Sequence, residues 1–226
     1  MGRRAVRFVP VILICEFITM WFFKKRIKPE TTTVENSINI HEDHVGMRNL
    51  FPSIVSDAVF AEMDKAIEAS EKNRSESGLG WDDIHVTELP EKDYSDAGLL
   101  LEECAKVLEE VLPRVNNFII GLTPNNPFYC KEEDAYCYGF GNHLFIKLET
   151  KGQFVSNIWY DIQTHDMNEL TAIRQAFLAI EALSSSVITD FWLQSDGYLA
   201  DSSFLDAYFE QFQNSKDETS LPHESD

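Results

Sequence analysis

Two apolar segments, residues 143–149 (HLFIKLE) and 154–162 (FVSNIWYDI), are separated only by a short turn around Lys151 and Gly152. Segments rich in β-branched and aromatic residues on both sides of such a turn are typical of a β-hairpin. A two-stranded hairpin is antiparallel, so a sheet built around it contains antiparallel pairs. The middle of the chain therefore favours a mainly antiparallel sheet over a doubly wound parallel one.

Apolar residues recur every three or four positions in several other segments, and this spacing predicts amphipathic helices. The helices are expected at residues 52–74, between Tyr94 and Pro113, at 166–183 and from Ser202 to Phe212. Asp166 and Glu169 have the spacing of a capping box at the start of the third. Shorter strands are expected at 84–86, 117–122 and 187–193. The mixture predicts an α+β fold in which helices pack on the sheet.

Charge is divided by position along the 226 residues. Residues 1–30 contain seven Lys and Arg against two acids, whereas the remaining residues contain 12 against 36. The first part is therefore near +5 and the rest near −24, within a formal net charge of −19. A field of this sign repels nucleic acid and attracts cationic partners.

The apolar run of residues 8–23 lies between basic residues on both sides. It contains Pro10 and Glu16 and is shorter than the roughly 20 residues of a spanning helix, so it predicts a marginal N-terminal membrane helix. The basic residues that follow favour a single-pass inner-membrane protein with a cytoplasm-facing domain. Two alternatives remain open: a cytoplasmic protein whose translation starts at Met20, and a cleaved signal peptide, although no small-residue cleavage site follows the run.

The chain is long enough for one domain with extensions. Its expected parts are a basic and apolar segment (1–28), a polar linker (29–46), a single acidic α+β domain (47–213) and a disordered tail (214–226).

Metal and catalytic motifs are weak in this sequence. The histidines of residues 41–44 (HEDH) are three positions apart, whereas a zinc-protease helix needs a spacing of four. Cys130, Cys137 and His143 lack the closely spaced cysteine pairs of structural zinc sites. We therefore expect no metal, no cofactor and no enzymatic activity, with a metal-dependent hydrolase as the weakest alternative. A disulfide between Cys130 and Cys137 stays open for an oxidising compartment.

Two acidic clusters contain aromatic residues, a combination that binds basic partners because rings anchor and carboxylates pair with Lys and Arg. Solvated acidic loops are the alternative interpretation. The predicted partner-binding residues are Glu132, Glu133, Asp134 and Tyr136 in the first cluster, and Asp190, Trp192, Asp196 and Asp201 in the second.

Residues 168–212 contain a helix ending in Ala182-Leu183, a strand with Asp and aromatic residues, an acidic turn and a YFEQF helix. This pattern, over about a fifth of the chain, resembles the C-terminal part of small bacterial immunity proteins from polymorphic-toxin and contact-dependent inhibition systems. The resemblance implies a non-enzymatic cytoplasmic antidote that neutralises a basic toxin by occluding its active site, with no catalytic residues to transfer. The alternative is a single-pass membrane-anchored protein whose soluble domain docks onto another envelope component.

Overall fold

The computed structural model describes residues 37–75, 85–121, 123–124 and 126–214. The helices are α1 (Ser56–Lys72), α2 (Leu101–Glu109), α3 (Met167–Leu183) and α4 (Ser202–Asn214), and short 3-10 helices cover Glu42–His44 (η2) and Ser53–Val55 (η3). The strands are β1 (Ser37–Ile40), β2 (Arg48–Pro52), β3 (Arg114–Val115), β4 (Asn117–Ile120), β5 (Cys130–Glu132), β6 (Cys137–Gly141), β7 (Leu144–Lys151), β8 (Phe154–Ile162), β9 (Ser186–Asp190) and β10 (Ser195–Tyr198).

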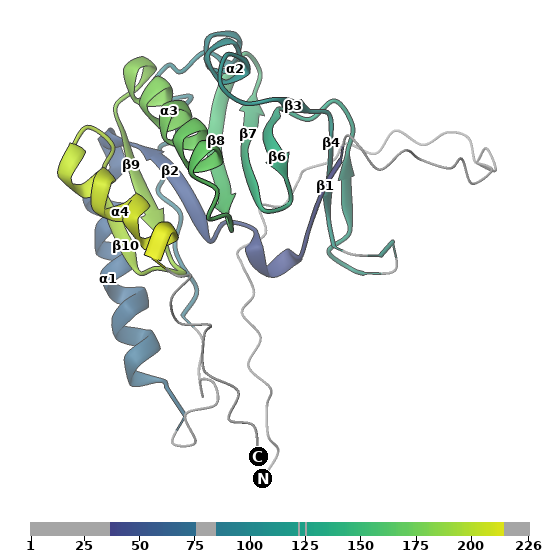
Figure 1. The fold of residues 1–226 in the computed structure, drawn as a ribbon. Coiled ribbons are helices and arrows are strands. Elements are labelled where there is room, and N and C mark those ends of the chain that lie inside the picture. The colour runs from purple at the N-terminus through teal and green to yellow at the C-terminus, as the bar shows by residue number, and fades with distance from the viewer. Residues whose placement is uncertain (1–36, 76–84, 122, 125, 215–226) are drawn as a thin grey trace, which may run out of the picture.

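Seven of these strands form one antiparallel sheet in the order β10-β9-β2-β8-β7-β6-β3 (Figure 1). The predicted hairpin is present as β7 and β8, paired from Leu144 opposite Ile162 to Lys151 opposite Phe154. The prediction of an α+β fold with a mainly antiparallel sheet is therefore confirmed.

One face of the seven-stranded sheet is covered by α2, α3 and α4 (Figure 1). Leu108 of α2, Phe177 of α3 and Phe209 of α4 belong to one buried cluster with Ile158 and Ile188 of the sheet. Burial of apolar surface between these layers is the main source of stability in a fold of this kind. The cluster therefore fixes α2 against the sheet.

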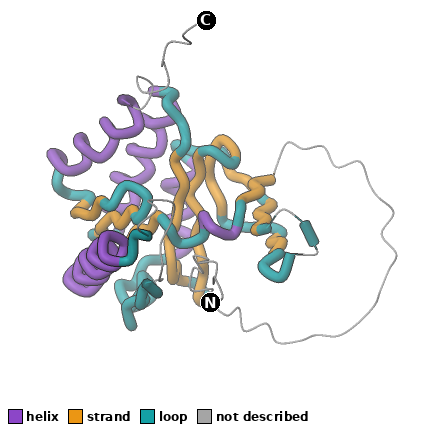
Figure 2. The backbone as a smooth tube through the Cα atoms, turned by 90° about the horizontal axis from the view of Figure 1, so that it is seen from below, coloured by secondary structure: helices purple, strands orange, loops and turns teal. Residues whose placement is uncertain are grey.

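The opposite face is covered in two places, by α1 and by a small second sheet, as Figure 2 shows from below. Val55 and Val59, before and within α1, pack on Phe51 and Val187. The small sheet has the order β1-β4-β5, with β1 parallel to β4, and its Phe118 packs edge-on against the rings of the main sheet.

The start of α3 matches its predicted cap. The Asp166 side chain accepts hydrogen bonds from the backbone N–H groups of Asn168 and Glu169, which satisfies two donors at the helix end. The Glu169 carboxylate contacts the Thr164 hydroxyl and His143 instead of completing a reciprocal box.

Several sequence-based expectations differ from the structure. The linker prediction for 29–46 is wrong within its described part, because residues 37–40 form β1 and bury Ile38 and Ile40. No regular structure occurs at 85–90, where the end of a short strand was expected. The strand expected at 187–193 ends at Asp190.

The predicted membrane segment at 8–23 and residues 215–226 of the predicted tail lie outside the described residues. Among the residues that are described, no helix has both the length and the hydropathy needed to cross a membrane.

Candidate partner-binding surface

The two predicted acidic clusters lie toward opposite edges of the main sheet. Residues 132–136 belong to the connection between β5 and β6, next to the β3 edge, whereas residues 190–201 surround β10 at the other edge (Figure 1). The two clusters therefore do not form one continuous surface.

Asp190 is fully buried, so its prediction as a partner-binding residue is wrong. Its side chain is fully buried and accepts hydrogen bonds from Arg48 Nε and from the Tyr208 hydroxyl, both at 2.8 Å. It also accepts from the backbone N–H of Trp192 at 2.9 Å. Its hydrogen-bonding capacity is thus satisfied inside the protein.

Asp201 and Asp196 of the second cluster interact with neighbouring groups of the protein itself. Asp201 accepts from the backbone N–H groups of Ser203 and Phe204 at the start of α4, and the Ser203 hydroxyl bond holds the pKa of Asp201 below its usual value. Asp196 is partly buried, which raises the pKa of its carboxyl, and the negative charge of Asp64 on α1 raises that pKa further. Asp196 is therefore partly shielded from solvent, whereas Asp201 is exposed and caps the start of α4.

Trp192 is the exposed member of the second cluster. Half of its surface is accessible, and its ring centroid lies 6.0 Å from that of His44. An exposed indole can anchor a partner, but the carboxylate nearest in sequence, Asp190, is turned into the core.

A buried charge network, Arg48, Asp161 and Asp190, connects β2, β8 and β9. Arg48 Nη1 lies 2.5 Å from Asp161 Oδ1, and His44 Nδ1 lies 2.9 Å from Asp161 Oδ2. Burial lowers the pKa of the Arg48 guanidinium, but Asp190 and Asp161 outweigh this effect, so the pKa is raised. Because each charge has a partner, the network holds the three strands together and is not an open binding site.

The candidate metal ligands are separated or otherwise engaged. Within the described ranges, no group of three or more His, Cys, Asp or Glu residues is placed to hold a metal ion. His143 contacts Glu169 at 3.1 Å. Cys137 is a buried free thiol, so it forms no disulfide with Cys130, and burial raises its pKa to about 12. A thiol with such a pKa is a poor nucleophile.

The first cluster borders a groove beside α2. This shallow groove of about 470 Å³ is lined by Leu101, Glu102, Ala105, Lys106, Glu109, Tyr136 and Gln153. The apolar members and Tyr136 are partly buried, whereas the charged residues are exposed. The groove therefore combines an apolar floor with a charged rim.

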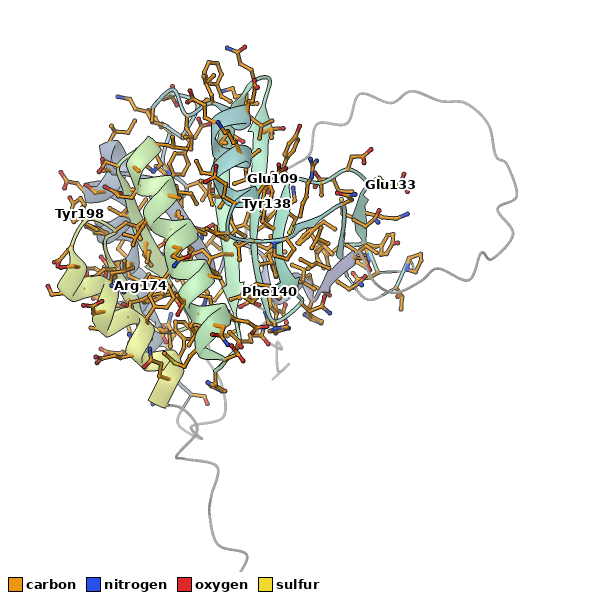
Figure 3. All side chains as sticks on the ribbon, turned by 45° about the horizontal axis from the view of Figure 1, so that its top comes forward. Glu109, Glu133, Tyr138, Phe140, Arg174 and Tyr198 are labelled. Carbon is orange, nitrogen blue, oxygen red and sulfur yellow. The ribbon has the colours of Figure 1, made fainter. Side chains whose placement is uncertain are left out.

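The chain places one of its own cations at this groove. Arg114, on β3, lies over the Tyr136 ring with its guanidinium carbon 4.9 Å from the ring centroid. Its Nη1 is 3.7 Å from Glu109 Oε1. The Tyr138 hydroxyl is buried and has no hydrogen-bond partner among the residues that the structure describes, and burial raises its pKa. Figure 3 shows Glu109 and Tyr138 close together beside α2, with Glu133 projecting from the β5–β6 connection.

We define the α2 acidic surface as four exposed carboxylates, those of Glu102, Glu103 and Glu109 on α2 and of Glu110 directly after it, of which Glu102 and Glu109 line the groove. The first-cluster carboxylates Glu132, Glu133 and Asp134 lie at the end of β5 and directly after it, and none of them lines the groove. Glu132 pairs with Lys147 and Glu133 with Lys131. Glu102, Glu103, Glu110 and Asp134 have no ion-pair partner among the residues with described positions. This surface keeps unpaired negative charge beside an aromatic ring.

The sequence analysis singled out Tyr136, which lines this groove, but not the glutamates of α2. The fold thus defines an acidic α+β protein with a carboxylate-rimmed groove. No protein-family model matches the chain, no curated protein matches it, and no solved structure matches it.

Proposed function

We propose that this protein is a non-enzymatic binding protein that neutralises a basic protein, such as a toxin, by covering its active site. The observation that carries the proposal is the groove at the α2 acidic surface, where Tyr136 and an apolar floor lie beside Glu109, which pairs with Arg114, and Glu102, which has no ion-pair partner among the described residues.

The physical reason is complementarity to long cationic side chains. Lys and Arg pack their aliphatic stems on apolar surface while their charged ends reach a polar rim. The groove offers Leu101 and Ala105 to such a stem and Glu102 and Glu109 to its charged end, and Lys106 adds one positive charge to the same rim. A net charge of −19 also accelerates the approach of a basic protein, since complementary fields steer encounter.

The resemblance of residues 168–212 to immunity proteins supports the same function. The other concentration of charge, the buried charge network, is satisfied within the core and supports a structural role. The α2 acidic surface, in contrast, presents its carboxylates to solvent.

The first prediction concerns neutralisation of a toxin. We expect co-expression of this protein to restore growth of cells that produce the protein encoded by the adjacent gene. The triple variant Glu102→Gln, Glu103→Gln, Glu109→Gln should lose protection, because it removes three exposed carboxylates of α2, two of which line the groove. Growth rate after induction is the measurement.

A matched triple variant separates this surface from net charge. Asp57→Asn, Glu68→Gln and Glu71→Gln neutralise three exposed acids on α1 and change the net charge equally. We expect this control to protect as wild type does. Equal loss by both variants would place the interaction elsewhere, and a neighbouring protein that is neither toxic nor bound would contradict the proposed function.

A further inference from the structure

We propose that the groove beside α2 receives an arginine side chain of the basic partner, and that Arg114 is an internal competitor for the same carboxylate. This inference rests on the proposed function and specifies the group that the α2 acidic surface recognises.

The arrangement of Arg114 shows the type of interaction that the groove supports. Its guanidinium lies over the Tyr136 ring and near the Glu109 carboxylate, so aromatic stacking and charge pairing occur together. A planar guanidinium makes both contacts at once, whereas a lysine ammonium is a compact point charge. The chemistry around Tyr136 therefore favours arginine over lysine.

The internal pair is weak enough to be displaced. Arg114 and Glu109 are 3.7 Å apart, and their side chains are 36% and 49% exposed. Exposed pairs of this length contribute little, because solvent screens them and both side chains lose freedom. An arginine with its stem on Leu101 and Ala105 gains apolar contact in addition, so it can take Glu109 from Arg114.

A second observation is a buried hydroxyl near Arg114 that lacks a hydrogen-bond partner among the described residues. The Tyr138 hydroxyl is fully buried and has no hydrogen-bond partner in the described part of the chain, and it lies close enough to Arg114 and Glu109 for their charges to act on it. Buried polar groups normally have partners. A rearrangement of Arg114 on partner binding changes the electrostatic field at this hydroxyl.

The second prediction is tested with single amino acids of known charge. Nα-acetyl-arginine amide and Nα-acetyl-lysine amide carry the same single positive charge. Each is titrated into the isotope-labelled full chain, and binding is monitored by the NMR chemical shifts of the backbone amides. We expect saturable shifts at residues 101–109, Tyr136 and Gln153, with arginine bound more tightly than lysine. Shifts spread over all acidic faces without saturation would overturn the inference.

Net charge alone predicts opposite signs for Glu109→Gln and Arg114→Gln, so the charge-neutral variant Tyr136→Leu and the distant variant Glu68→Gln separate the groove from net charge. Tyr136→Leu keeps an apolar side chain but removes the ring, so arginine binding should weaken by about two- to fivefold, as expected for an exposed cation–π contact. Glu109→Gln should weaken it similarly, whereas Arg114→Gln should strengthen it, because the competitor is gone. Glu68→Gln on α1 should leave binding unchanged.

Arg114→Gln and Glu109→Gln change exposed side chains, so these variants keep the test valid even if Tyr136→Leu folds poorly. Weaker binding by Arg114→Gln would overturn the competitor role. If the adjacent gene product is neutralised equally by wild type and Glu109→Gln, the groove inference fails while the proposed function stands. If arginine binds the groove but no toxin is neutralised, the proposed function fails instead.

Discussion

At the residue scale, Arg48 is the position with the largest predicted effect on stability. It is 7% exposed and pairs with two carboxylates that are themselves buried, Asp161 and Asp190. In Arg48→Met these two charges lose their partner, so we expect a loss of about 3–5 kcal/mol in the free energy of unfolding, typical of a broken buried pair. Urea denaturation followed by tryptophan fluorescence measures it.

Arg174→Met is the matched control for this third prediction. Arg174 pairs with Asp206 at the surface, where both side chains are substantially exposed. We expect a change of no more than about 1 kcal/mol, because exposed pairs contribute little. Similar losses in the two variants would contradict a structural role of the buried charge network.

Asp190 shows which part of the site could be predicted from the sequence. Ser186, Ile188 and Asp190 point to one face of β9, since side chains alternate along a strand, and Ile188 lies in the core. Once the position of β9 is known, the alternation of side chains along the strand therefore predicts that Asp190 points inward. Its partner Arg48 is 142 positions away, and no local pattern could indicate that contact.

At the element scale, α4 depends on a close approach to β10. An ideal Cβ on Gly197 would lie 2.7 Å from the Phe204 ring. Gly197→Ala should therefore push α4 away from the sheet and cost about 1–3 kcal/mol, as overpacking does. Thermal or urea unfolding measures this fourth prediction.

The double variant with Phe204→Ala identifies the cause. If the clash with Phe204 is responsible, Gly197→Ala should cost clearly less in a background that already carries Phe204→Ala. Simple additivity of the two changes would show that the glycine is needed for another reason.

The segment 85–92 is attached to α1 through Glu62, which is 4% exposed. Its carboxylate lies 2.7 Å from His85 Nε2 and accepts a hydrogen bond from the backbone N–H of Glu88. Burial raises the pKa of Glu62, but the hydrogen bonds from Glu88, Lys65 and His85 outweigh burial, so the pKa lies below its ordinary value of 4.5. The ionised carboxylate is therefore the form that stabilises the folded chain.

The fifth prediction follows from the sign of this shift. A lowered pKa contributes stability that is present above the unfolded value and is lost as the pH falls through the folded value. The difference in unfolding free energy between wild type and Glu62→Gln should be constant above about pH 5.5 and shrink below 4.5. Glu68→Gln, exposed on the same helix, should show no such pH dependence. A difference that grows on acidification would contradict the assignment.

The elements that the sequence predicted are those with strong local patterns. All four helices follow from apolar periodicity, and β7 and β8 from their composition and turn. In contrast, β1 is only four residues long within a polar stretch, and β2 buries Arg48 and Asn49 without alternation. In β6, an ideal Cβ on Gly139 would lie 2.2 Å from Leu144 O, a close approach that only tertiary structure reveals.

At the scale of the whole molecule, the division of charge was visible in the sequence, but the surface that results was not. The acidic loop before β6 and the glutamates of α2 are about 25 positions apart, and Tyr136, directly before β6, lines the groove together with α2. A groove formed by a helix and a distant loop depends on the sheet order, which residue periodicity does not specify.

The position of β2 has a consequence for synthesis on the ribosome. This strand is central in the sheet, but its neighbours β8 and β9 are translated more than a hundred residues later. Until Ile162 has emerged, both edges of β2 lack their permanent partners, and the β9 edge stays unpaired until Asp190 has emerged. Exposed edges invite pairing with other chains. Nascent chains stalled before the end of β9 should therefore bind chaperones, and release should coincide with completion of that strand.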